Sequence, residues 1–200
     1  MKKIGSLNTK LLSIAILVIA IGVASFILIS KNNQPVNALQ TKFATLTAAS
    51  SDFCSNLGQP DAITSEINSL SNTARLQGAC CSPMDFTAYK EQLDGLKAYK
   101  NISYIAPDPY DVPASLAKSL LTFDQTIVLT ASQQQVYEAA GPMTHDKGWC
   151  CCKCWAWYTH SGLAKYLITK ENFNAKQVAT VTNLEDCCGG PPDSSGYIVT

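Results

Sequence analysis

Charge and recognisable catalytic motifs are both scarce in this sequence. Only 15% of its 200 residues are charged, and 15 basic side chains balance 15 acidic ones to a formal net charge of zero. This balance excludes a nucleic-acid-binding protein that works through a large basic patch. The chain also lacks a nucleophile elbow, a phosphate-binding loop, a zinc-protease pair and the Cys-x-x-Cys-His motif of c-type haem. We therefore predict no enzyme activity and no catalytic residues.

A long apolar run near the N-terminus predicts a membrane anchor. Leu11 to Ile29 is nineteen residues without a charge, which at about 1.5 Å per residue just spans a bilayer core of about 30 Å. Three lysines precede the run, whereas Lys31 alone follows it closely. The positive-inside rule then leaves the N-terminus in the cytoplasm and residues 31–200 outside, as in a single-pass cell-membrane protein. The alternative is a cleaved signal peptide and a secreted protein.

This topology determines the surroundings of the rest of the chain. Residues 31–200 keep 12 of the 15 basic groups and all 15 acidic ones, a net charge of −3. We therefore expect the membrane, but no nucleic acid, as a partner. All nine cysteines lie in this part of the chain, and disulfides persist in an oxidising extracytoplasmic compartment.

Apolar spacing and capping residues predict an all-α fold, with a compact domain of about six helices after the transmembrane helix. Helix starts are indicated at Ser82 before Pro83, at Thr130 and at Asn174. The best strand candidate, Thr126 to Thr130, is short. The predicted divisions are a cytoplasmic tip and anchor (1–30), a stalk-like helix (31–57), a cysteine-rich helical domain (58–190) and a loose tail (191–200).

Eight of the nine cysteines fall in three clusters, and each cluster is expected at a helix end. The clusters are Cys80 with Cys81, then Cys150, Cys151, Cys152 and Cys154, then Cys187 with Cys188. The middle cluster is expected to begin a helix that runs from about Cys151 to Ile168. On a helix, residues three or four apart share a face, whereas in an extended segment alternate residues do. Either geometry brings several sulfurs to one point.

Clustered thiolates favour a soft metal ion, with Cu(I) first and Zn(II) second. The predicted ligands are the eight clustered cysteines, with His145 and His160 as nitrogen donors. Met84 and Met143 could add thioether sulfur, and a mixed thiolate, imidazole and thioether set favours copper. Such a protein would store, transfer or sense metal at the membrane and exchange it with a metal-donor or metal-acceptor protein.

Two other uses of the cysteines stay open. The eight clustered residues could instead form four disulfides between clusters, giving a structural or partner-binding module stabilised by about 2–4 kcal/mol per bridge. Alternatively, Cys151-Cys152-Lys153-Cys154 is a C-x-x-C at a helix start, a pattern of thiol–disulfide oxidoreductases.

All three tryptophans surround the middle cluster. Trp149, Trp155 and Trp157 could shield a metal–sulfur centre from water. They could equally pack in the hydrophobic core between helices.

The segment from Gly148 to Cys154 resembles a motif of bacterial exported proteins grouped by the sequence PCYCGC, which are largely uncharacterised and often lipoproteins. Cys150, Cys152 and Cys154 match the alternating cysteines of that motif, and His160 matches its downstream histidine. In this chain tryptophan, cysteine and lysine replace the motif's proline, tyrosine and glycine, and there is no lipobox. The resemblance implies an exported, membrane-attached, cysteine-rich protein in which metal binding is suspected.

Overall fold

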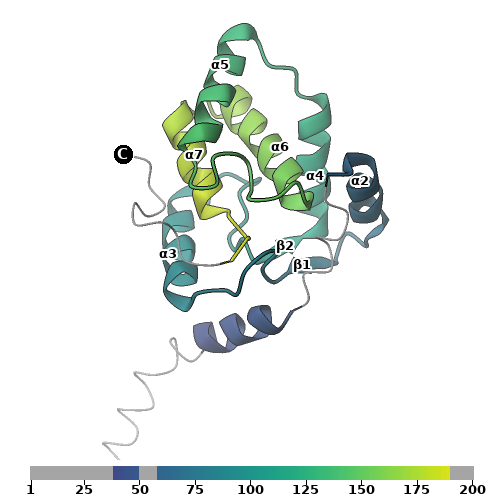
Figure 1. Cartoon of the computed structure of the whole chain (residues 1–200), viewed down its shortest axis with the longest axis vertical. Coiled ribbons are helices and arrows are strands. Elements are labelled where there is room, and N and C mark those ends of the chain that lie inside the picture. Colours follow the sequence, from purple (N-terminus) through teal and green to yellow (C-terminus); the bar gives the residue numbers. More distant parts are fainter. Residues whose placement is uncertain (1–37, 50–57, 190–200) are drawn as a thin grey trace, which may run out of the picture. The chain divides into compact units, whose positions relative to one another are not determined.

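The computed structural model describes residues 38–49 and 58–189 (Figure 1). Contacts divide the chain into two compact units, Met1–Lys42 and Phe43–Thr200. Of the first unit only residues 38–42 are described. The second unit carries every cysteine of the described ranges.

Helices make up most of the described chain. Residues 38–48 are helical. The elements that follow are α2 (Pro60–Ser69), β1 (Arg75–Gln77), α3 (Phe86–Leu96), η2 (Lys97–Tyr99), β2 (Asp111–Pro113), α4 (Ala114–Thr126), α5 (Ala131–Ala140), η3 (Gly141–Met143), α6 (Trp155–Lys170) and α7 (Ala175–Leu184).

Two of the predicted helix starts are confirmed, and both are capping boxes. The Thr130 hydroxyl accepts from the Gln133 amide while the Gln133 side chain accepts from the Thr130 amide. Asn174 and Gln177 make the same reciprocal pair at the start of α7. Each box satisfies two amides that the helix itself leaves unpaired, so the local sequence is sufficient to place the helix start.

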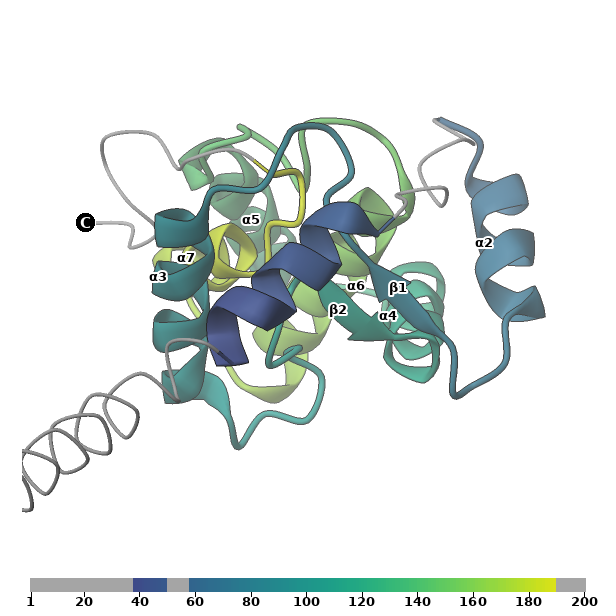
Figure 2. The ribbon, with the colours of Figure 1, turned by 90° about the horizontal axis from the view of Figure 1, so that it is seen from below.

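The prediction of an all-α fold is wrong because the chain also forms a small antiparallel sheet. β1 pairs with β2 (Figure 2), and in their register Leu76 lies opposite Val112. Both side chains are buried. Three-residue strands are too short to show a period of two in the sequence, so the sequence contains no pattern that predicts this strand pairing.

The expected strand at Thr126 to Thr130 is also wrong. Thr126 is the last residue of α4, and no strand forms between it and α5.

Two predicted helix starts lie a few residues too early. Asp85, and not Ser82, caps α3, and its carboxylate accepts from the Ala88 amide. Likewise, α6 begins at Trp155 with Cys154 as its N-cap. The segment from Cys150 to Cys154 therefore precedes the helix and is neither helical nor a strand.

The prediction of a single-pass membrane protein finds no support in the described residues. Within residues 38–49 and 58–189, no helix has both the length and the apolar character that a membrane crossing requires. The run from Leu11 to Ile29 lies outside the described residues. The helical stretch 38–48 falls in the predicted stalk, but residues 50–57 and 191–200 are likewise outside the described ranges, so the predicted domain boundaries stay a prediction.

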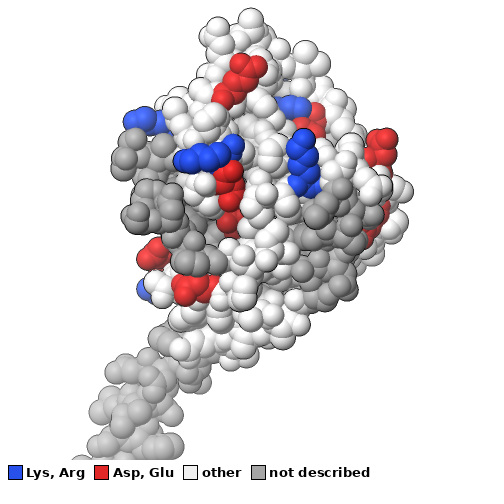
Figure 3. All heavy atoms as spheres, viewed as in Figure 1, with Lys and Arg blue, Asp and Glu red and all other residues white. Residues whose placement is uncertain are grey.

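Lysine, arginine, aspartate and glutamate side chains are interspersed on the face that Figure 3 shows. This pattern agrees with the balanced charge of the sequence, since charges of one sign do not gather on that face.

The core lies where α4, α5 and α7 pack on α6. Leu163 and Leu167 of α6 are buried with Leu120 of α4 and Val178 of α7. Gly162 lets α4 approach α6 closely, because a Cβ at this position would overlap the carbonyl oxygen of Leu120.

Gly162→Ala is expected to destabilise the protein by about 2 kcal/mol, the usual scale of overpacking a core. Intrinsic helix preference alone predicts the opposite sign, a gain of about 1 kcal/mol for alanine over glycine. Urea unfolding of the reduced protein decides between the two. Gly95→Ala is the control, since the atoms nearest to its Cβ would be those of the Leu184 side chain rather than backbone; a stabilised Gly162→Ala protein would contradict the packing argument.

Candidate metal centre

Backbone pairing joins two of the cysteine clusters. The amides of Cys80 and Cys81 donate to the carbonyl oxygens of Cys187 and Cys188, at 2.9 and 3.0 Å. Gly189 adopts a positive φ of 80° and passes so close to Ser82 that a Cβ would overlap the Ser82 carbonyl oxygen. The residues after α7 thus lie against the residues before α3.

The third cluster adds its sulfurs to this pair. Cys188 Sγ lies 2.9 Å from the Sγ atoms of both Cys150 and Cys151. Cys81 Sγ lies 3.1 Å from Cys151 Sγ and 3.4 Å from Cys152 Sγ. Cys154 Sγ lies 4.0 Å from Cys150 Sγ. The six sulfurs of Cys81, Cys150, Cys151, Cys152, Cys154 and Cys188, here called the thiol cluster, thus form one connected group.

The other two predicted cysteine ligands, Cys80 and Cys187, are not members of the thiol cluster. Cys80 is disulfide-bonded, although its sulfur lies 3.9 Å from Cys154 Sγ. Cys187 is a free thiol that is 1% exposed. It belongs to none of the ligand groups found among the described residues.

The thiol cluster has a buried side and an open side. Cys150, Cys154 and Cys188 are buried, Cys152 is half-buried, and Cys81 and Cys151 are exposed. An ion could therefore enter from solvent at the Cys81 edge and be held against buried sulfurs. The arrangement can hold a metal ion.

The sulfur spacings differ from those of disulfides. A disulfide needs about 2.05 Å between sulfurs, and all the thiol-cluster distances are 2.9 Å or longer. Zinc–sulfur bonds of about 2.3 Å would place tetrahedral sulfurs about 3.8 Å apart. The separation of 4.0 Å between Cys150 and Cys154 fits that value, while the separations of 2.9–3.4 Å would have to lengthen by about 0.4–0.9 Å on metal binding.

Four thiols of the cluster have raised pKa values, which favour their neutral form unless a cation is present. Burial raises the pKa of Cys81 and of Cys152. The contact with the Cys150 thiol, together with burial, raises the pKa of Cys154. At Cys188 the contact with Cys150 acts to lower the pKa, but burial and the nearby Asp186 carboxylate outweigh it and raise the pKa. Because a bound cation stabilises thiolates, it would replace these protons.

His160 is turned away from the thiol cluster. Its Nδ1 lies 2.6 Å from the Trp149 carbonyl oxygen and its Nε2 lies 3.1 Å from the Glu185 carbonyl oxygen. Burial lowers the pKa of this imidazole. The ring therefore joins the segment before Cys150 to the segment before Cys187, which makes it a positioning residue for the sulfurs.

His145 lies at the border of the thiol cluster, in a group with Asp146 and Asp186 whose ligand atoms are within 4.8 Å of one another. Its Nε2 lies 3.0 Å from an Asp186 carboxylate oxygen, and the other carboxylate oxygen accepts from the Cys188 amide at 2.9 Å. Despite burial, the contact with His145 lowers the pKa of Asp186. Neither aspartate was expected at the site; in the sequence, only the position of Asp146 next to His145 could have pointed to it.

Neither methionine joins the sulfurs through a described contact. Met84 is buried, and its thioether sulfur accepts a hydrogen bond from the Thr47 hydroxyl at 3.8 Å. Met143 is 39% exposed at the end of η3.

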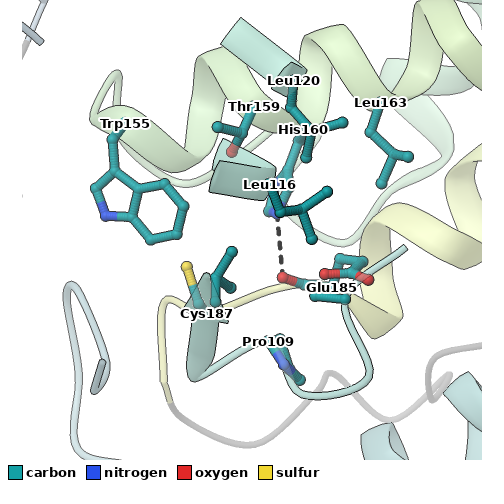
Figure 4. A pocket seen from close by; sticks show the side chains of 11 residues that line it. Pro109, Leu116, Leu120, Trp155, Thr159, His160, Leu163, Glu185 and Cys187 are labelled. Atoms are coloured by element: carbon teal, nitrogen blue, oxygen red, sulfur yellow. Dashed lines mark hydrogen bonds between the residues drawn. The ribbon is translucent and has the colours of Figure 1, made fainter. Parts of the chain in front are cut away.

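The tryptophans mostly pack as core residues. Trp149 is buried with its ring 4.5 Å from that of Tyr137. Trp155 lines a pocket beside Cys187 and His160 (Figure 4). Trp157 is half-buried, with the Lys153 ammonium 5.6 Å from its ring centre. Of these contacts, only the one with Lys153 involves a residue of the segment from Cys150 to Cys154.

Comparison with protein-family models, curated proteins and solved structures finds no match to this chain. The resemblance to exported proteins with the PCYCGC motif therefore stays a prediction.

Proposed function

We propose that this protein binds a soft metal ion, Cu(I) in preference to Zn(II), and that it stores or transfers that ion. The observation that carries the proposal is the thiol cluster itself. Six free thiols from three separate parts of the chain lie in one connected group, with neighbouring sulfurs 2.9–4.0 Å apart. Polarisable sulfur ligands select soft ions.

The ligand sets favour copper over zinc. Structural zinc sites are four-coordinate, but two of the three sulfur-containing groups of the described residues offer three sulfurs and no further ligand. Cu(I) carries a single charge and a filled d shell, and it is stable with three thiolates. Among the described residues, Asp146 is the one carboxylate that joins a sulfur group.

Thiol–disulfide exchange is supported less well by this geometry. A catalytic thiol needs a lowered pKa, because the thiolate is the nucleophile. Contact with Cys150 and burial instead raise the pKa of Cys154, the second cysteine of the C-x-x-C.

Metal content and thiol number, measured on the same anaerobically purified full chain, test the proposal. We expect bound copper after growth with copper, thiols of the cluster that resist alkylation while the metal is bound, and their full recovery after denaturation with a chelator. A folded protein with no bound cation and with these six cysteines oxidised would contradict the proposal and support the disulfide alternative.

Two buried cysteines provide a matched pair of variants. Cys150→Ser removes a sulfur that belongs to two ligand groups, so we expect it to lose most of the bound copper. Cys187→Ser changes a sulfur that is equally buried but belongs to none of those groups, so its copper content should match the unaltered protein. Equal loss in both variants would show that burial, rather than ligation, causes the effect.

A further inference from the structure

The three groups of sulfur ligands share their members in a regular way. The first group contains Cys150, Cys151 and Cys188 together with Asp146. The second group contains Cys81, Cys151 and Cys152. The third group contains Cys150, Cys152 and Cys154. Within each group all ligand atoms lie within 4.8 Å of one another. Any two of the groups therefore have one cysteine in common.

We infer that the thiol cluster holds three Cu(I) ions in one thiolate-bridged centre, an inference that rests on the proposed soft-metal function. Cys150, Cys151 and Cys152 each belong to two groups and would bridge two ions. Cys81, Cys154 and Cys188 each belong to one group and would be terminal ligands. Every ion then has two bridging sulfurs and one terminal sulfur, and the metals and bridges alternate in a closed ring.

The order of residues in the chain explains this division. The three bridging sulfurs are consecutive, and the terminal ones come from the residues before α3, the N-cap of α6 and the residues after α7. A bent segment of three adjacent cysteines can direct its sulfurs to one centre, while the three terminal positions close its outer side. The short distances are bridge-to-terminal contacts, at 2.9 Å for Cys151 to Cys188 and 3.1 Å for Cys151 to Cys81.

Coordination number, rather than charge, favours three monovalent ions in this centre. Loading would replace six thiol protons, released to solvent, by three Cu(I) ions, leaving a net charge of about −3 on the centre. Three Zn(II) ions would balance the six thiolates, but each would need a fourth ligand, and Asp146 supplies one for a single group only.

Copper stoichiometry of the anaerobically reduced full chain tests this inference. On titration with Cu(I), native mass spectrometry should show the form with three ions building up directly from the metal-free form, with little of the one-ion and two-ion forms. X-ray absorption should show sulfur neighbours and a copper–copper scattering shell. A protein that saturates at one ion, without that shell, would overturn the trinuclear centre but leave the proposed function intact; no binding would overturn both.

Two exposed cysteines distinguish bridging from terminal positions. Cys151→Ser removes a ligand from two groups and leaves one intact, so it should retain about one ion. Cys81→Ser removes a ligand from a single group, so it should retain about two. Both side chains are exposed, which makes the fold tolerant of either change. Equal retention in the two variants would contradict the bridging assignment even if the unaltered chain binds three ions.

Discussion

Loading the reduced protein with Cu(I) is expected to raise its melting temperature by about 10 °C. A ligand that binds only the folded state stabilises it by about 4 kcal/mol when its free concentration is a thousand times its dissociation constant. For a chain of this size each kcal/mol corresponds to about 2–4 °C. The ligands of the thiol cluster are brought together only by folding, since Cys81 and Cys152 are 71 residues apart in sequence. Thermal unfolding followed by circular dichroism, with and without Cu(I), measures the shift.

A bridging variant separates specific binding from general effects of copper on thiols. Cys150→Ser should show a much smaller shift, and addition of a strong Cu(I) chelator to the unaltered protein should reverse the shift. If metal-free and copper-loaded proteins melt at the same temperature, the thiol cluster does not bind copper in the folded state.

Glu185→Gln is expected to stabilise the protein increasingly as pH rises above about 5. Burial raises the pKa of the Glu185 carboxyl well above its ordinary value of 4.5, and one of its oxygens has no hydrogen-bond partner in the described structure. A raised pKa in the folded state means that stability is fully present below 4.5 and is lost as pH rises towards the folded pKa. The unaltered protein loses up to about 1.4 kcal/mol per pH unit in that window, and the glutamine variant does not.

The groups around Glu185 do not remove the free-energy cost of ionising its buried carboxyl. The Ala106 backbone lowers the pKa of the carboxyl, but the nearby Asp108 carboxylate acts in the same direction as burial and raises it. His160 contacts the backbone carbonyl of Glu185, as the dashed line in Figure 4 shows, rather than its carboxyl group. Cys187 is the adjacent titratable group on the other side of the pocket (Figure 4).

Urea unfolding at several pH values between 4 and 8, on reduced metal-free protein, measures the effect. Glu91→Gln, a change of an exposed glutamate on α3, serves as the control and should alter stability by a constant small amount. A difference between Glu185→Gln and the unaltered protein that does not depend on pH would contradict the assignment of a neutral buried carboxyl.

Local signals predicted part of this fold well. The capping boxes at Thr130 and Asn174 are contacts between residues three apart in the chain, so the sequence contains all the information that they need. Ser82 failed as a helix start for a tertiary reason: its amide donates to the Cys188 carbonyl oxygen at 2.7 Å. Ser82 thus continues the backbone pairing of residues 80–82 with residues 187–188, and Asp85 caps the helix.

Long-range pairings were beyond prediction. β1 and β2 are joined across more than thirty residues and are three residues each, so neither shows a pattern of its own. His160 was expected as a metal ligand, but its two ring nitrogens face carbonyl oxygens of Trp149 and Glu185. In the sequence, a histidine that contacts two backbone segments looks the same as a metal-ligating histidine. Only the fold shows which chain segments surround its ring.

The number of cysteines, their three clusters and the helix starts at Thr130 and Asn174 were determined by the sequence alone, since each depends on residues close together in the chain. Only the tertiary structure decided which sulfurs meet, which cysteine is disulfide-bonded and which stands apart. Cys188 reaches Cys151 across 37 residues and Cys81 reaches it across 70. Such distances are closed by helix packing and by backbone pairing of residues 80–82 with residues 187–188, and no local spacing encodes them.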